Sequence, residues 1–259
     1  MGNKVNICGV NIDNVSMAES IKLCEQFIDT GKPVYVVTPN VDHIVQLQRD
    51  KELEDIYAQA SLAIPDGMPL VWASKFLGTS LKEKVSGSDI FPMLCELSAH
   101  RGFRIFLLGG REDAAEQTAE IMKRKYKGLV VSGVYSPPFG FETDEKENDR
   151  IIDMIKDSDP DILFVGLGTP KQEKWIYKYY KQLNIPVSMG IGATFDFISG
   201  IVKRAPKWMQ KAGLEWLWRT VMEPGRLWKR YFMQDFKFLG IFIKYYSSRT
   251  QKYEDHMLK

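Results

Sequence analysis

The sequence predicts an α/β protein in which helices cover both faces of one parallel sheet, followed by a helical C-terminal appendage. Short apolar runs alternate with helix-length segments through the first two hundred residues, and this alternation implies parallel strands with right-handed crossovers. Near residue 202 the strand-like runs cease and cationic, helical sequence takes over. We therefore expect a ligand-binding domain over residues 1–202 and an appendage over residues 203–259.

Six runs are expected to be buried strands, because each is short, apolar and mostly rich in β-branched residues. They are PVYVVT (33–38), SLAI (61–64), FRIFLLG (103–109), LVVSGV (129–134), DILFVGLG (161–168) and PVSMGIG (186–192). The segments between them carry helix start signals. Ser16 with Glu19 forms a capping-box pattern, and Asn40, Ser88 and Thr143 are residue types favoured at helix N-caps.

The composition predicts a folded chain that does not cross a membrane. Of the 259 residues, 44% are hydrophobic and 26% are charged, which argues against intrinsic disorder. Three widely spaced cysteines without a CxxC pair favour reduced thiols in the cytoplasm over disulfides or a zinc site. The N-terminus lacks the apolar core of a signal peptide, and the longest apolar stretches, such as FLGIFI (238–243), are too short for a bilayer span.

The charge is distributed unevenly along the chain. Residues 203–259 carry 13 Lys and Arg against 5 Asp and Glu, a balance of +8, whereas the remainder carries −6. Four of the six tryptophans also lie in residues 203–259. A basic, aromatic tail on a mildly acidic body indicates an anionic partner such as a membrane surface, nucleic acid or phosphate.

The segment from Pro224 predicts an amphipathic helix. At about 100° per residue, four cations share one stripe and five apolar residues lie opposite. Such a helix suits the interface of an anionic membrane, where each cation contributes on the order of 1 kcal/mol. The same pattern also suits a helix docked on the protein's own core, so both readings stay open. The cations are Arg226, Arg230, Lys237 and Lys244, and the apolar residues are Trp228, Phe232, Leu239, Phe242 and Tyr246.

Small and polar residues follow the predicted strands, where ligands of open parallel sheets bind. Gly109 and Gly110 end one strand, and Gly168 lies in the GLGTPKQE segment (166–173). Glycines there let backbone N–H groups approach a phosphate, so a nucleotide-diphosphate ligand fits. Neither GxGxxG nor a Walker A sequence is present, and tight strand–helix turns would explain the same glycines.

Asp66 is the most informative carboxylate, because it lies between Pro65 and Gly67 directly after an apolar run. From a strand end it would project into the ligand crevice and serve as a general base. Thr38 and Asn40, at the end of the preceding strand, would hold the same ligand. Asp66 and Asn40 are also good helix N-caps, which is the competing explanation for both.

The sequence gives no sign of a metal site. The DSD triplet (157–159) precedes its strand, so we expect a solvated turn at the edge of the sheet opposite the ligand. The three histidines are scattered without metal-ligand spacing. We therefore expect chemistry without a metal or another cofactor.

Several segments, in this order along the chain, resemble the WecG/TagA/CpsF glycosyltransferases. The matching segments are VTPNVDHI, IPDGMPLVWASKFLG, VSGSDIFP, FLLGG, GLGTPKQEKWI, GIGATFDFISG, RAPKWMQKAGLEWLWR and EPGRLWKRY. The resemblance implies a Rossmann-like domain that binds a UDP-sugar and a C-terminal appendage that attaches the enzyme to the inner face of the cell membrane. It implies metal-independent, inverting transfer to a polyprenyl-diphosphate-linked acceptor. TagA-type members transfer N-acetylmannosamine to undecaprenyl-diphosphate-GlcNAc, which makes the linkage unit of wall teichoic acid.

The resemblance also assigns roles to residues. Asp66 would be the general base, and Thr38, Asn40 and Gln172 would line the sugar and acceptor site. Lys84 stands where the family often has arginine, so it would act as a point charge rather than a bidentate fork. The loop VYSPPFGF differs from its family counterpart and leaves the donor contacts open. The cations that would reach a diphosphate are Arg219, Arg226 and Arg230.

Other functions stay open from the sequence. A nicotinamide-dependent oxidoreductase is disfavoured by the missing GxGxxG, and a non-catalytic lipid-binding module would leave Asp66 without a role. Binding of nucleic acid is disfavoured by the acidic body and the lack of a recognised module. The donor sugar is not fixed, with the uronic acid of N-acetylmannosamine as one alternative. Oligomeric state is open, a homo-oligomer included.

Overall fold

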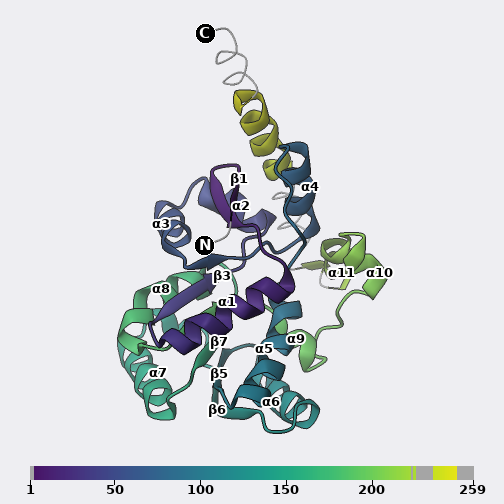
Figure 1. Ribbon diagram of the computed structural model, residues 1–259. Helices are drawn as coiled ribbons and strands as arrows, with labels where there is room; N and C mark the ends of the chain where they lie inside the picture. The colour runs from purple at the N-terminus through teal and green to yellow at the C-terminus, as the bar shows by residue number, and fades with distance from the viewer. Residues whose placement is uncertain (1–2, 223, 226–235, 250–259) are drawn as a thin grey trace.

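The protein is built on a six-stranded parallel sheet, in a computed structural model that describes residues 3–222, 224–225 and 236–249 (Figure 1). The strand order is β4-β3-β8-β7-β5-β6, and every neighbouring pair is parallel. All six predicted strands are confirmed. They are β3 (Val34–Val37), β4 (Leu62–Ala63), β5 (Arg104–Gly109), β6 (Val130–Tyr135), β7 (Ile162–Gly166) and β8 (Val187–Gly190).

Helices cover both faces of the sheet, as predicted. Alternate residues of β3, β5 and β7 enter two separate core clusters; in β5, for example, Phe106 and Leu108 face one cluster and Ile105 and Leu107 face the other. The first cluster is covered by α2 (Val41–Leu47), α3 (Lys51–Gln59), α4 (Met68–Phe76), α7 (Glu145–Ser158) and α8 (Lys171–Leu183). The second is covered by α1 (Met17–Thr30), α5 (Gly87–Arg101), α6 (Ala114–Lys125) and α9 (Thr194–Ile198).

Two of the four predicted helix starts are confirmed. Ser16 and Glu19 form the capping box of α1, and Asn40 caps α2 by accepting from the His43 N–H. Ser88 is wrong as an N-cap, because Ser86 has the extended backbone of a cap and Ser88 lies in the first turn of α5. Thr143 is wrong because it lies in a short 3₁₀ turn (Phe141–Thr143). The following Asp144 caps α7 instead, with a carboxylate that accepts from the Glu147 N–H.

An N-terminal β-hairpin was not foreseen. The strands β1 (Lys4–Ile7) and β2 (Val10–Asp13) pair antiparallel around Cys8 and Gly9, both at positive φ. The Asp13 carboxylate accepts from the Ala63 N–H at 2.8 Å, which joins the hairpin to β4 at the edge of the main sheet. The hairpin buries its apolar residues in the first core cluster.

The C-terminal part is helical where the structure describes it. It contains α10 (Lys207–Lys211), α11 (Glu215–Met222) and helical residues 224–225 and 236–249. All strands of the described residues precede residue 202. The division into domains at that point stays a prediction. None of the helices that the structure describes is long and apolar enough to cross a bilayer.

The helix over 236–249 packs against the body of the protein with one of its faces. Phe238, Ile241, Phe242 and Tyr245 lie against the first core cluster, and the Tyr245 hydroxyl donates to Asn6 Oδ1 of β1 at 2.8 Å. Phe242 therefore fits the second reading of the amphipathic pattern, a helix docked on the protein's own core. Leu239 and Tyr246 are exposed, as the amphipathic pattern predicts. Four tail residues of that pattern, Arg226, Trp228, Arg230 and Phe232, lie outside the described residues, whereas Lys237 and Lys244 lie within the helix over 236–249.

Candidate active site

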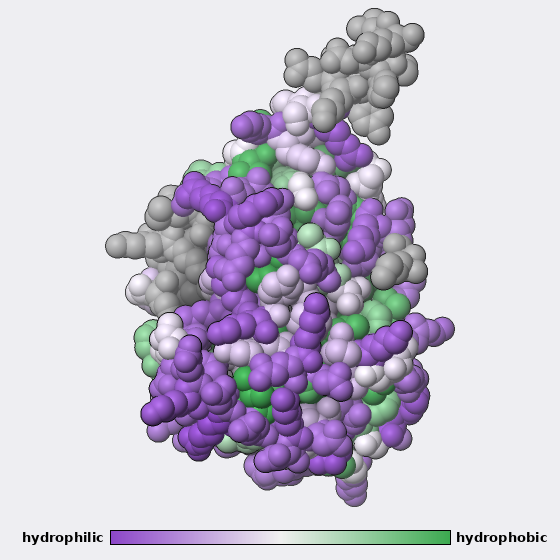
Figure 2. Space-filling view, turned by 90° about the vertical axis from the view of Figure 1, so that its left-hand side faces the viewer, coloured by the Kyte–Doolittle hydropathy of each residue, from purple (hydrophilic) through white to green (hydrophobic). Residues whose placement is uncertain are grey.

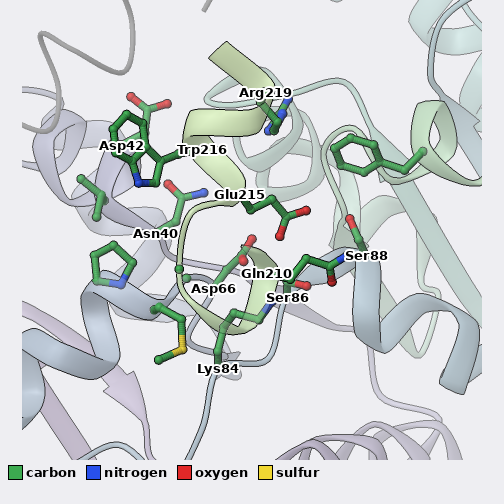
Figure 3. A pocket seen from close by; sticks show the side chains of 16 residues that line it. Asn40, Asp42, Asp66, Lys84, Ser86, Ser88, Gln210, Glu215, Trp216 and Arg219 are labelled. Atoms are coloured by element: carbon green, nitrogen blue, oxygen red, sulfur yellow. The ribbon is translucent and has the colours of Figure 1, made fainter. Parts of the chain in front are cut away.

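Two hollows meet at the carboxyl ends of the strands. The first, the α4–α11 cavity, has a volume of 170 Å³ and lies between the start of α4, the loop before α5, and α11 (Figure 3). The second, the strand-end cavity, has a volume of 410 Å³ and follows the ends of β5, β7 and β8. Both are lined by the same five residues, Asn40, Asp66, Ser88, Phe197 and Arg219.

Asp66 lies where the two cavities join. Its backbone N–H donates to the Pro39 carbonyl at 2.8 Å, which fixes the segment after β4 beside the segment after β3. The N-cap position of α4 is occupied by Gly67 at φ 117°, with no side-chain capping bond. The explanation of Asp66 as a helix cap is therefore wrong, and the side chain is left to the cavity.

The environment of Asp66 favours a proton-accepting role near neutral pH. Burial raises the pKa of its carboxyl to about 7, although the nearby Lys84 lowers it. Glu215 raises the pKa further, since a second negative charge disfavours ionisation. A carboxyl that titrates near the working pH is well matched to general-base catalysis.

Lys84 supplies positive charge in the α4–α11 cavity. Its Nζ lies 3.0 Å from Asp89 Oδ2, and its side chain is mostly buried. Figure 3 shows Lys84 and Glu215 on different sides of Asp66. The sequence prediction placed Lys84 near the ligand, and the structure brings it to the same cavity as Asp66.

Thr38 and Asn40 both reach the strand-end cavity. Thr38 is buried and its hydroxyl donates to the Gly190 carbonyl at 3.4 Å. Asn40 both caps α2 and lines the cavities, so its two explanations are compatible.

Gln172 lines the strand-end cavity but its amide is already engaged. Its Nε2 donates to Glu173 Oε1 at 2.7 Å, and its carbonyl oxygen accepts from the Gly192 N–H at 3.0 Å. The side chain is buried, and it holds the loop after β8 in place. Gln172 therefore shapes the cavity wall as well as bordering it.

The three predicted glycines have different surroundings. Gly110 and Gly168 line the strand-end cavity, both at positive φ. Gly109 does not line it. A Cβ at Gly109 would lie 2.8 Å from the Gly166 carbonyl oxygen, so this glycine permits the close approach of β5 and β7.

Arg219 projects from α11 and borders both cavities. Its guanidinium lies 5.3 Å from the ring centre of Phe197. Its Nε is buried and has no hydrogen-bond partner within the part of the chain that the structure describes. A buried donor without a partner costs free energy, which a bound anion would recover. Arg226 and Arg230, the other predicted arginines, lie outside the described residues.

The structure adds polar pairs that the sequence did not single out as partners. His43 Nε2 lies 3.3 Å from Glu173 Oε1; both side chains are buried, and His43 borders the strand-end cavity. Asp196, also buried, pairs with Arg111 Nε at 3.3 Å and borders the same cavity. Asp196 was visible as the last residue of GIGATFD after a strand, but its partner belongs to another strand end.

The residues expected to be remote from the ligand lie as predicted. Asp157 and Asp159 are exposed at the end of α7, before β7 begins. Across residues 3–222, 224–225 and 236–249, no group of three His, Cys, Asp or Glu side chains is placed to hold a metal ion. Metal independence itself stays a prediction.

Comparison with known proteins identifies the family. Residues 5–252 match the model of the glycosyl transferase WecG/TagA/CpsF family. Similar proteins include the N-acetylglucosaminyldiphosphoundecaprenol N-acetyl-beta-D-mannosaminyltransferase of Bacillus spizizenii, which is 33% identical over 79% of this chain and 77% of its own length. The proteins of the same name from Bacillus subtilis and Staphylococcus aureus are 30% and 28% identical, over 87% and 88% of this chain and 84% and 86% of their own lengths. The strand ends, the cavities and these matches agree: the chain belongs to the WecG/TagA/CpsF family of glycosyltransferases.

Proposed function

We propose that this enzyme transfers N-acetylmannosamine from UDP-N-acetylmannosamine to undecaprenyl-diphosphate-linked GlcNAc, as in synthesis of the wall teichoic acid linkage unit. The observation that carries the proposal is Asp66, a carboxyl with a pKa of about 7 at the junction of two cavities. The names of the relatives support the acceptor and the transferred sugar.

The proposed reaction is a single inverting displacement. A hydroxyl of the acceptor sugar attacks the anomeric carbon of the donor while its proton passes to Asp66. The bond between that carbon and the diphosphate oxygen breaks on the opposite face, and UDP leaves with the electron pair. One carboxylate suffices, because the leaving diphosphate is stable without a proton.

We assign the nucleotide of the donor to the strand-end cavity. Its rim contains glycines that follow β5, β7 and β8, where backbone N–H groups approach a diphosphate without hindrance. The α4–α11 cavity then receives the acceptor sugar. Its lining includes Val41, Met68 and Trp216, which suits the less polar side of a sugar ring and the start of a lipid chain.

Cations at the junction would offset charge on the leaving diphosphate. Arg219 has a buried Nε with no partner among the described residues, and Lys84 stands on the other side of Asp66. We propose that both act on a diphosphate, together with Arg226 and Arg230. Thr38, Asn40 and Gln172 would fix the sugar and the loops around it.

We propose that the protein attaches peripherally to the inner face of the cell membrane through the helix over 236–249 and α4. Both pack on the first core cluster, and Figure 1 draws them at the same end of the molecule. On the helix, Phe236, Leu239 and Ile243 are 62%, 52% and 56% exposed. On α4, Trp72 and Phe76 are 42% and 74% exposed. The face in Figure 2, by contrast, is mainly hydrophilic.

A donor screen tests the proposed function. Purified enzyme, detergent-solubilised undecaprenyl-diphosphate-GlcNAc and a panel of UDP-sugars are combined, and UDP release and product mass are measured. Turnover with UDP-N-acetylmannosamine, undiminished by EDTA, is the expected result. Turnover only with its uronic acid would move the enzyme to another branch of the family. No turnover with any donor would favour a lipid-binding module instead.

A further inference from the structure

Four alternating charges form a chain behind the wall of the α4–α11 cavity. Lys84 Nζ lies 3.0 Å from Asp89 Oδ2, and Arg204 Nη2 lies 2.8 Å from Asp89 Oδ1. Arg204 Nε lies 3.0 Å from Glu215 Oε1. We call Lys84, Asp89, Arg204 and Glu215 the four-charge chain. Its formal charges sum to zero, and its members come from the loop before α5, α5, the segment before α10, and α11.

Arg204 is the member that connects the two ends of the chain. Its planar guanidinium contacts two carboxylates at once, a geometry that lysine does not reproduce. The side chain is only 22% exposed, so these pairs are less screened than surface ion pairs. Lys203, the residue before Arg204, also contacts α11, because the Trp218 indole donates to its carbonyl at 2.9 Å. Docking of α11 thus depends on this segment.

The two ends of the four-charge chain face Asp66. Lys84 and Glu215 line the same cavity as Asp66, and Figure 3 shows them around its carboxylate. Lys84 favours the ionised form of Asp66, whereas Glu215 and Asp89 oppose it. The other charged or titratable groups around Asp66 include His43 and Asp42 from α2, Tyr57 from α3 and Arg219 from α11.

We propose that Arg204 is a positioning residue that couples the docking of α11 to the charge balance around Asp66. When α11 is docked, Arg204 and Lys84 together balance Asp89 and Glu215, so the four-charge chain adds no net charge beside the ionised base. When α11 is undocked, Glu215 and Arg219 both leave the cavity. The coupling to turnover rests on the role of Asp66 proposed above, whereas the docking of α11 does not.

The central test is Arg204→Gln, which changes the net charge of the four-charge chain from zero to −1. The acid limb of the pH–rate profile should move to higher pH by on the order of one pH unit, because an added negative charge disfavours ionisation of Asp66. Backbone amides of α11 should exchange hydrogen faster. Arg204→Lys should loosen α11 with a smaller pH shift, since the charge stays while the two-carboxylate geometry is lost.

A double variant separates charge from packing. Arg204→Gln/Glu215→Gln restores a neutral chain, so the acid limb should return toward its wild-type position. Exchange of the α11 amides should stay fast, because the contact itself is missing. An acid limb that stays shifted in the double variant would overturn the charge argument.

A matched control exists elsewhere in the fold. Arg101 also joins two carboxylates, Glu25 and Asp29 of α1, but it lies at the end of α5 away from both cavities. Arg101→Gln should change neither the acid limb nor exchange in α11. Equal effects of Arg101→Gln and Arg204→Gln would reduce Arg204 to a general stabilising residue.

The pKa of Asp66 is also measured without turnover. The difference in melting temperature between Arg204→Gln and Arg204→Gln/Asp66→Asn is measured across pH. The difference between the wild type and Asp66→Asn is measured in the same way. The pH at which each difference levels off reports the pKa of Asp66 in the folded state, even if Asp66 is not the base. An unchanged pKa in the Arg204→Gln background, or unchanged exchange in α11, would overturn the proposal.

Discussion

The Asp66 carboxyl lies at a strand end, where burial and nearby charges of both signs control its protonation state. Two features lead to it from sequence alone: a preceding apolar run and a following glycine. The structure adds why the residue does not cap α4, since Gly67 takes that position with a positive φ. The structure also shows that Lys84, which lowers the pKa of Asp66, and Glu215, which raises it, lie close to this carboxyl.

Asp66→Asn should nearly abolish transfer while donor binding stays within a few-fold. The amide keeps the shape of the side chain but does not accept a proton, so a loss of about 10²–10⁴ in rate is expected. UDP release measures the rate, and calorimetry measures donor binding. Near-normal turnover of this variant would remove Asp66 from the role of base.

The raised pKa of Asp66 also predicts opposite effects of pH on activity and stability. Turnover should rise as pH passes through about 7, because only the ionised carboxylate accepts a proton. Stability should fall as pH rises from the unfolded pKa of 3.8 to about 7, because over this range the folded state holds a proton that the unfolded state has released. Asp66→Asn should therefore melt higher than the wild type above about pH 7, with little difference at acid pH. Asp153→Asn, an exposed change on α7, is the control.

Contacts between residues far apart in the chain could not be predicted from the sequence. His43 and Glu173 are 130 positions apart, and Arg111 and Asp196 are 85 apart. No local pattern marks either pair, since they meet only when the strand ends assemble. Arg204 and Glu215 are closer in sequence, but their bridge to Asp89 depends on how the appendage packs on α5.

At the scale of elements, periodicity predicted where strands and helices form better than it predicted what each element packs against. The β1–β2 hairpin was missed because each strand has four residues and a tight turn, too short for a clear alternating pattern. The tail was predicted to be helical, and residues 236–249 form a helix. Its apolar residues nevertheless face two environments: Phe242 packs on the core, whereas Leu239 is exposed.

The exposed faces of α4 and the tail helix predict how membrane binding responds to mutation. Trp72→Ser/Phe76→Ser should weaken flotation with anionic vesicles at all salt concentrations, because apolar contacts are not screened. Lys237→Glu/Lys244→Glu should weaken it mainly at low salt, since screening already suppresses charge attraction at high salt. Both variants should turn over a soluble acceptor analogue normally. Met93→Ser, on α5 and exposed to the same extent as Trp72, is the control. Unchanged flotation of both variants would show that α4 and the tail helix do not bind the membrane.

At the scale of the whole molecule, the parallel sheet with helices on both faces followed directly from strand–helix alternation. Its strand order did not, because alternation says nothing of which strands become neighbours. The cavities follow from that order: β3 lies between β4 and β8, which brings Asp66 after β4 near the loops after β7 and β8.

Removing residues 203–259 should release the protein from anionic vesicles, since the exposed residues of α4 alone bind weakly, and should nearly eliminate catalysis. The exposed aromatic residues of the tail and most of the cationic surplus would be lost together, as would Arg219 and Glu215 from the cavity. Turnover is measured with a soluble acceptor analogue, so that loss of membrane contact does not explain loss of rate. Circular dichroism checks that the sheet remains folded. If the truncated chain turns over the soluble analogue as fast as the full chain, the tail serves only as a membrane anchor and takes no part in catalysis.

The hydrogen bond between Tyr245 and Asn6 also fixes an order of events during synthesis. The two residues are 239 positions apart, so the hairpin leaves the ribosome long before the helix that packs on it. Closing so long a loop costs little more entropy than closing a loop of half the length, so the late contact remains thermodynamically accessible. The sheet can therefore fold first, and the aromatic helix is made only when its docking surface is complete. A nascent chain thus spends little time with these aromatic residues exposed and no folded body beside them.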